Sequence, residues 1–217
     1  MPDLDPRSLG VYVVISATLI PGRGHREIAR AAIEGGATAI QLRAPEMGDE
    51  ELGAVAAELA SWCREAGVLF IVNDRLDVAV GSGADGVHLG QKDGIERARE
   101  RLGPERVLGI SAEDAAQASA AAEADADYLG VTLWATSTKP EAHGIGLDGL
   151  AAVARDPGLP VVGIGGVDAG NARDVLAAGA AGIAVVSAVA ASPDPVAATR
   201  ELRLIVDGYR NQEGTRP

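Results

Sequence analysis

The feature of this sequence that most constrains its fold is a short apolar run followed by an amphipathic stretch, a unit that recurs along the whole chain. Apolar runs of about four to seven residues, bounded by Gly or Asp, are typical of parallel strands that are covered on both faces. We predict such strands at 11–15, 37–43, 68–72, 86–89, 107–110, 128–131, 161–164 and 182–186. Apolar residues at helical spacing predict helices at 26–34, 49–66, 76–81, 95–102, 114–123, 147–154, 171–178 and 195–209.

The number and spacing of these units indicate the fold class. Eight strand–helix units of about 25 residues, without a linker or a break in composition, favour a (β/α)8 TIM barrel over an open, doubly wound α/β sheet. We therefore expect a single domain over residues 1–217, with flexible tails at 1–9 and 212–217.

Composition narrows the possible partners and the location. Hydrophobic residues make up 47% of the chain, which suffices for a full core, and the net charge of −12 argues against nucleic acid or an anionic membrane as partner. No signal peptide begins the chain and no apolar run approaches ~20 residues, so we expect a cytoplasmic protein. Cys63 is the single cysteine, which excludes an intrachain disulfide, and we expect it to be buried on its helix.

Polar residues and glycines follow most of the predicted strands. In a TIM barrel the carboxyl ends of all strands face one rim, so these residues should converge there. The residues concerned are Gln41, Arg43, Asn73, Asp74, Asp93, Ser111, Lys139, Gly165, Gly166 and Ser187. Such a convergence indicates a binding or active site rather than core filling.

Two of these residues are carboxylates at the ends of neighbouring predicted strands, Asp74 and Asp93. Mg²⁺ typically takes one or two protein carboxylates, while waters and substrate phosphates complete its octahedron. The pair therefore predicts a magnesium site. The alternative is that both aspartates cap the helices that follow them.

Two segments suit phosphate groups. Residues 163–166 (GIGG) and Ser187 follow the seventh and eighth predicted strands, where TIM barrels often bind a phosphate through backbone N–H groups. The alternative for GIGG is a tight strand-to-helix turn. Residues 136–139 (TSTK) in the long loop 132–146 offer three hydroxyls and an ammonium, although a solvated loop would have the same composition.

Gln41 and Arg43 alternate with Leu42, so both should face one side of the second strand. If that side is the barrel interior, Arg43 needs an anionic partner, either a ligand or Asp74 or Asp93 in a structural ion pair. Of the histidines, His88 is interpreted as a hydrogen-bonded core or rim residue, and His25 as an exposed helix start. His143 lies in the long loop, within possible reach of a ligand.

The motifs taken together resemble one enzyme family over nearly the whole chain. They are Gln41-Leu42-Arg43, Asn73-Asp74-Arg75, Gly86-Val87-His88-Leu89-Gly90-Gln91 with Asp93, Gly109-Ile110-Ser111, Ala126-Asp127-Tyr128-Leu129-Gly130, Thr138-Lys139, Gly163-Ile164-Gly165-Gly166 and Val185-Val186-Ser187-Ala188. This set resembles the thiamine-phosphate synthase family, which shares its barrel with the TenI-type thiazole tautomerases.

The resemblance implies a transferase reaction in thiamine biosynthesis. A hydroxymethylpyrimidine pyrophosphate loses pyrophosphate, and the nitrogen of a thiazole phosphate captures the resulting pyrimidine methyl cation. The matched positions imply Mg²⁺ on Asp74 and Asp93, and pyrophosphate on Arg43, Asn73 and Lys139. They imply the pyrimidine on Gln41 and Ser111, and the thiazole phosphate on Thr136, Thr138, Gly166, Val186 and Ser187. The residues implied in catalysis are Arg43, Asn73, Ser111 and Lys139.

The sequence departs from the family pattern in two places. Pro45 stands where the family usually has a lysine, and Val131-Thr132 stands where it usually has Gly-Pro. Lys92 could supply the missing cation. Two alternatives stay open: a tautomerase that needs no metal, and a barrel that binds phosphate ligands without catalysis. The sequence also leaves open whether the chain forms a homo-oligomer.

Overall fold

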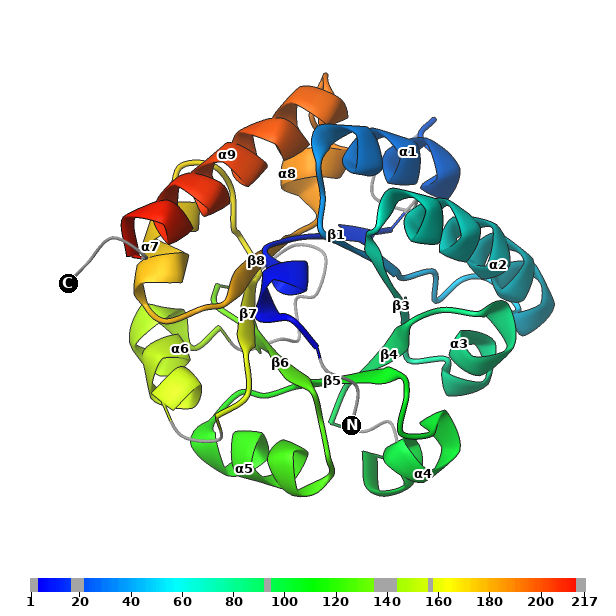
Figure 1. Ribbon diagram of the computed structural model, residues 1–217, viewed down its shortest axis with the longest axis horizontal. Helices are drawn as coiled ribbons and strands as arrows, with labels where there is room; N and C mark the ends of the chain where they lie inside the picture. The colour runs from blue at the N-terminus through cyan, green and yellow to red at the C-terminus, as the bar shows by residue number, and fades with distance from the viewer. Residues whose placement is uncertain (1–3, 17–21, 92–94, 135–143, 156–157, 214–217) are drawn as a thin grey trace.

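The computed structural model describes residues 4–16, 22–91, 95–134, 144–155 and 158–213. Its eight parallel strands pair in sequence order, and β8 pairs with β1, so the sheet closes into a barrel (Figure 1). The strands are β1 (Val11–Ile15), β2 (Ala39–Leu42), β3 (Leu69–Asn73), β4 (Gly86–Leu89), β5 (Val107–Ser111), β6 (Tyr128–Thr132), β7 (Val161–Ile164) and β8 (Gly182–Val185). Each bound lies within two residues of the prediction, and the predicted TIM barrel is confirmed.

A ring of helices surrounds the barrel (Figure 1). They are α1 (His25–Gly35), α2 (Asp49–Ala66), α3 (Leu76–Ser82), α4 (Ala98–Leu102), α5 (Ala115–Glu123), α6 (Gly146–Arg155), α7 (Ala172–Ala177), α8 (Ser187–Ala190) and α9 (Pro195–Glu213). Sequence reasoning missed α8, because four residues are too few to show a helical period. Among the described residues, no helix is both long and apolar enough to cross a membrane.

Side chains alternate along each strand between two apolar cores. Val11, Val13 and Ile15 of β1 face outward into the larger core, which the strands share with the helices. Cys63 of α2 is fully buried in this core, as predicted. Tyr12 and Val14 belong to the smaller core, which lies inside the barrel. Its other members are Leu9, Ala39, Ile71, Val107, Tyr128, Val162 and Ala184.

The N-terminal end of the barrel is covered by the chain that precedes β1. The short 3-10 helix η1 (Pro6–Leu9) lies in the middle of the ring of strands in Figure 1, and Leu9 is fully buried in the inner core. Arg210 of α9 donates hydrogen bonds to the carbonyl groups of Pro6 and Arg7. The expectation of a flexible tail over residues 1–9 therefore does not hold for residues 6–9, because they cover the inner core. Near the C-terminus of the polypeptide, α9 continues to Glu213 instead of ending at residue 209.

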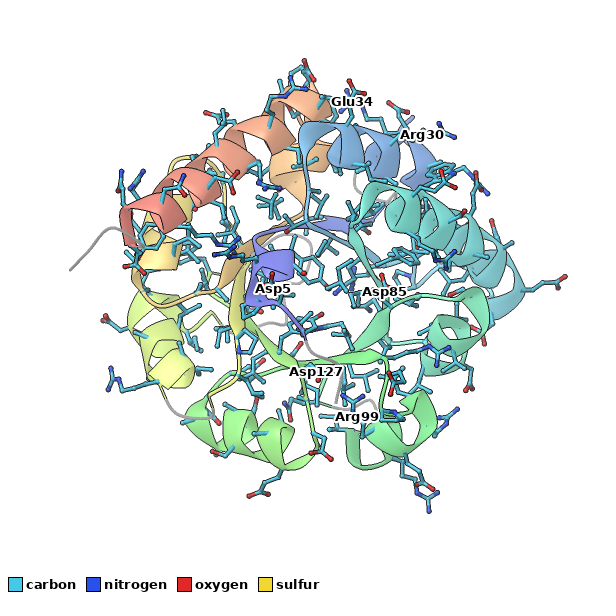
Figure 2. All side chains as sticks on the ribbon, viewed as in Figure 1. Asp5, Arg30, Glu34, Asp85, Arg99 and Asp127 are labelled. Atoms are coloured by element: carbon cyan, nitrogen blue, oxygen red, sulfur yellow. The ribbon has the colours of Figure 1, made fainter. Side chains whose placement is uncertain are left out.

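At the N-terminal end of the barrel, two aspartates that precede strands accept hydrogen bonds from backbone N–H groups of neighbouring strands. Asp127, just before β6, accepts a hydrogen bond from the Leu108 N–H of β5 (2.7 Å) and pairs with Arg99 (2.6 Å). Asp85, just before β4, accepts one from the Phe70 N–H of β3 (2.8 Å). Figure 2 shows both aspartates and Arg99 on this face. These bonds satisfy backbone N–H groups next to the buried core.

His25 corrects one expectation from the sequence. It begins α1, as expected, but only 6% of its surface is exposed. Gly24 is the N-cap of α1, and the imidazole of His25, the first residue of the helix, packs inward. Burial lowers the pKa of His25 from its usual value of 6.5, although Glu46 acts in the opposite direction.

Candidate active site

The carboxyl ends of the strands surround a cavity of about 330 Å³. Seven of the residues predicted to bind substrate lie on its wall: Gln41, Arg43, Asn73, Ser111, Gly166, Val186 and Ser187. They come from β2, β3, β5 and the segments that follow β7 and β8. The convergence predicted from strand order is therefore present for these residues. Thr136, Thr138, Lys139 and Asp93 lie outside the described residues, as do Lys92 and His143.

One wall of the cavity is a turn made of two glycines. Gly165 and Gly166, directly after β7, both have left-handed backbones (φ of 91° and 71°). Residues other than glycine rarely adopt this conformation. Asn171 holds this turn, because its side-chain amide donates to the Gly166 carbonyl group (2.8 Å). Sequence reasoning missed Asn171, which had been assigned only to a helix start.

The short helix α8 begins beside this turn, with Val186 as its N-cap and Ser187 as its first residue. The first N–H groups of a helix have no partner within the helix, so they are available to an anion. The turn and the helix start together form the arrangement in which TIM barrels hold a phosphate group. The geometry is also that of a tight strand-to-helix turn, which is the alternative interpretation of GIGG.

A second polar wall carries a cation. Arg43, directly after β2, is half-buried and lines the cavity with Asn73 of β3. Within the described part of the chain, Arg43 makes no ion pair, which contradicts the alternative of a structural pair with Asp74. Arg43 is therefore placed to receive an anion that enters the cavity.

Asp74 follows Asn73 and also has a left-handed backbone (φ of 62°). It lines a smaller neighbouring cavity of about 220 Å³ rather than the main one. Helix α3 has Arg75 as its N-cap, and Arg75 makes no side-chain capping bond. The other two carboxylates of this smaller cavity, Asp49 and Asp77, pair with Arg75 and Arg101. Among the described residues, no three potential ligands are grouped closely enough to form a metal site.

The floor of the cavity is a chain of hydrogen bonds that sequence reasoning missed. The Gln41 amide donates to the Tyr12 hydroxyl (2.8 Å), which bonds to the Tyr128 hydroxyl (2.8 Å). Tyr128 in turn bonds to Nδ1 of His88 (3.0 Å), whose Nε2 bonds to the Ser111 hydroxyl (3.1 Å). The interpretation of His88 as a hydrogen-bonded residue is confirmed. The available signal for the tyrosines was their position inside otherwise apolar strands.

Burial raises the pKa of both tyrosines well above the usual value of 10, so both hydroxyl groups keep their protons. Two glycines make room for the rings of the floor. A Cβ atom at Gly109 would lie 2.1 Å from the Tyr128 ring, and one at Gly130 would lie 2.8 Å from the His88 ring. The chain of hydrogen bonds therefore depends on a glycine in β5 and a glycine in β6.

A closed barrel with a cavity at its C-terminal rim, lined by both polar and apolar residues, and a two-glycine turn after β7 is typical of TIM-barrel enzymes that act on phosphorylated small molecules. Comparison with known proteins identifies the family. The sequence profile of the thiamine monophosphate synthase family matches residues 11–189. The chain belongs to this family, so the predicted family and the transferase activity in thiamine biosynthesis are confirmed.

Named relatives agree with this result. The chain is 48% identical over 198 residues to the thiamine-phosphate synthase of Chloroflexus aurantiacus, covering 90% of this chain and 92% of that protein. It is 46% identical over 205 residues to that of Moorella thermoacetica, covering 93% and 98%. Among solved structures, a thiamine phosphate pyrophosphorylase from Pyrococcus furiosus superposes with a TM-score of 0.86 at 41% identity, covering 94% and 98%.

Proposed function

We propose that the protein couples hydroxymethylpyrimidine pyrophosphate to thiazole phosphate in the main cavity, as in thiamine-phosphate synthase. One observation supports the assignment of sites: two walls of different composition, one of glycines and a helix start and one with a guanidinium, line a single cavity. The wall after β7 and β8 offers backbone N–H groups, whereas the wall on β2 and β3 offers the guanidinium of Arg43. Two phosphorylated substrates of different charge fit two such walls.

Thiazole phosphate is assigned to the turn of Gly165 and Gly166 and to the start of α8 at Ser187. Backbone N–H groups bind an anion there without the net positive charge that an acidic chain lacks. Val186 would pack against the same substrate, and Thr136 and Thr138 would approach it from the long loop. Pyrophosphate is assigned to Arg43 and Asn73, with Lys139 as a third contact.

The reaction breaks the bond between the pyrimidine methylene carbon and a pyrophosphate oxygen, and the electron pair leaves with the oxygen. The lone pair of the thiazole nitrogen then forms the new C–N bond to that carbon. Negative charge gathers on the pyrophosphate as the first bond breaks, so Arg43 and Lys139 stabilise the transition state more than the ground state. Gln41 and Ser111 would hold the pyrimidine ring on the floor of the cavity.

Asp74, in the small cavity that neighbours the main one, is the described candidate ligand for a magnesium ion shared with the substrate. Asp74 offers hard carboxylate oxygens beside Asn73, and Mg²⁺ usually takes only one or two protein carboxylates when phosphates complete its shell. We infer that Asp74 and Asp93 hold the ion. When bound, Mg²⁺ would neutralise charge on the departing pyrophosphate.

The first test is an activity assay. Purified protein with both substrates and Mg²⁺ should form thiamine phosphate, and EDTA should abolish the product. Asp74→Asn should remove most activity, whereas the control Asp77→Asn, in the same small cavity but paired with Arg101, should keep it. Equal turnover in EDTA would contradict the metal. Isomerisation of a thiazole carboxylate phosphate without thiamine phosphate formation would favour the tautomerase alternative.

The second test separates the phosphate wall from the rest. Gly166→Val should abolish calorimetric binding of thiazole phosphate, because valine disfavours the left-handed backbone and its Cβ atom would lie 3.4 Å from Trp134. Gly158→Val is the matched control. Gly158 has a similar φ of 68° with nothing within 4 Å, and it lies away from the cavity. Unchanged affinity in Gly166→Val would count against this assignment.

A further inference from the structure

The hydrogen bonds on the cavity floor link five side chains from five strands. Gln41 of β2, Tyr12 of β1, Tyr128 of β6, His88 of β4 and Ser111 of β5 form one continuous chain of four bonds, with lengths between 2.8 and 3.1 Å. The two ends, Gln41 and Ser111, both line the cavity. Each hydroxyl in the middle has only one proton, so the direction of one bond restricts the direction of the next.

The direction follows from Tyr12. Its hydroxyl is buried, and within the described part of the chain it contacts only Gln41 and Tyr128. The Gln41 nitrogen can only donate a hydrogen bond, so the Tyr12 hydroxyl must donate its own hydrogen bond to Tyr128. A buried hydroxyl without an acceptor would be costly. The Tyr128 hydroxyl then accepts the hydrogen bond from Tyr12 and donates its own hydrogen to Nδ1 of His88.

The same constraint continues to the other end. With Nδ1 as an acceptor, the His88 ring carries its proton on Nε2 and donates to the Ser111 oxygen. Ser111 therefore directs its own proton toward the cavity. At the first end, one N–H of the Gln41 amide is used by Tyr12, and the carbonyl oxygen is the acceptor that Gln41 offers to a ligand. Turning the Gln41 amide over would require every proton in the chain to move to the opposite atom.

We propose that Tyr12, Tyr128 and His88 are positioning residues that fix opposite hydrogen-bonding roles at the two ends of the floor: Gln41 accepts from the substrate and Ser111 donates to it. This inference rests on the proposed function, in which the pyrimidine ring lies on this floor. A ring that directs a hydrogen-bond donor toward Gln41 and an acceptor nitrogen toward Ser111 meets both requirements. A ring with the reverse pattern leaves two buried polar groups unpaired, which is the strongest basis for rejecting an analogue.

The two glycines beneath the floor indicate that the fold makes room for this chain of hydrogen bonds. Both Gly109 and Gly130 leave space that a methyl group would remove, and the space is occupied by Tyr128 and His88. The rings also pack against each other, with centroids of Tyr128 and His88 5.5 Å apart. Because the rings cannot shift easily, the proton order is set by the bonds rather than by rearrangement of the side chains.

The first experiment needs no substrate. Nitrogen-15 NMR of histidine-labelled protein near pH 8 should show His88 as the Nε2–H tautomer. The sequence has three histidines, so a His88→Gln spectrum identifies the signal. In Tyr128→Phe the donor to Nδ1 is gone, and the fixed preference for that tautomer should be lost. An Nδ1–H signal in the wild type would overturn the proposal.

The second experiment measures kinetics. Tyr128→Phe should raise KM for the pyrimidine pyrophosphate by about 3- to 10-fold, the range for one neutral hydrogen bond, while kcat and KM for thiazole phosphate change less than twofold. Tyr209→Phe, on the outer helix α9, is the matched control and should change nothing. An unchanged KM in Tyr128→Phe would overturn the proposal.

A double-mutant cycle with Tyr12→Phe and Tyr128→Phe distinguishes an effect of the connected hydrogen bonds from an effect of side-chain packing alone. Tyr12→Phe interrupts the same chain at another bond, so the double variant should have about the same KM as either single variant. If KM in the double variant rose by the product of the two single-variant factors, the proposal would be overturned. A wild type without synthase activity would contradict the proposed function instead, while the tautomer measurement would still test the floor.

Discussion

The two ends of the barrel treat their charged groups differently. At the N-terminal end, Arg99 pairs with Asp127 and also donates to three backbone carbonyl groups, and Asp127 accepts a backbone N–H as well. At the C-terminal end, Arg43 makes no ion pair among the described residues. One end uses its polar groups for stability, and the other leaves a cation available to a ligand. Substitutions at the two ends should therefore separate stability from activity.

The largest expected effect is on stability at the N-terminal end. Asp127→Ala should lower the free energy of unfolding by about 3–5 kcal/mol, because it leaves Arg99 without its carboxylate partner and the Leu108 N–H without an acceptor. Urea denaturation measures this. The control Asp77→Ala breaks an exposed pair with Arg101 and should cost about 1 kcal/mol or less. Equal losses in both variants would contradict the distinction.

At the C-terminal end, the expected effect is on catalysis. Arg43→Ala should lower kcat/KM for the pyrimidine pyrophosphate by roughly 10- to 150-fold, which corresponds to about 1.5–3 kcal/mol for one charged contact. Its free energy of unfolding should change by less than about 0.5 kcal/mol. Arg30→Ala is the matched control, because Arg30 lies over the Trp62 ring on the outer surface. A large loss of stability in Arg43→Ala would show that Arg43 has a structural partner.

Pro45 tests how many cations this end needs. It is exposed in the loop after Arg43, at the position where the sequence departs from its family. We predict that Lys92→Ala lowers turnover by at least tenfold and that Pro45→Lys restores part of it, since one charged contact is worth about that much. Steady-state assays of the two single variants and the double variant measure this. If Lys92→Ala has no effect, Arg43, Lys139 and Mg²⁺ supply enough positive charge.

The smallest expected effect concerns His25, which is buried at the start of α1. Because burial lowers its pKa below 6.5, the unfolded chain binds more protons than the folded chain just below that pH. Its contribution to stability is therefore constant above about pH 6.5 and falls as the pH drops through and below that value. Urea denaturation between pH 7.5 and 5.5 should show a smaller slope in His25→Gln than in the wild type. The same slope in both proteins would contradict this contribution.

The sequence predicted the barrel and the residues on its rim for a physical reason. Buried strands and amphipathic helices have local periodicities, and parallel strands in a closed barrel must all end at one rim. Gln41, Arg43, Asn73 and Ser111 were found in this way. The roles given to them and to Asp74 stay predictions, because no local pattern specifies which ligand atom a side chain contacts.

The sequence alone therefore determined the order of the elements, the fold class and the family. Only the tertiary structure decided which polar groups meet. Tyr12 and Tyr128 are 116 positions apart, and their hydroxyls meet because barrel closure and strand register bring β1 and β6 to the same depth. The lack of an ion pair at Arg43 within the described residues is likewise decided by the tertiary structure. Local sequence encodes the periodicity of each element, whereas contacts across the barrel depend on how all eight strands close.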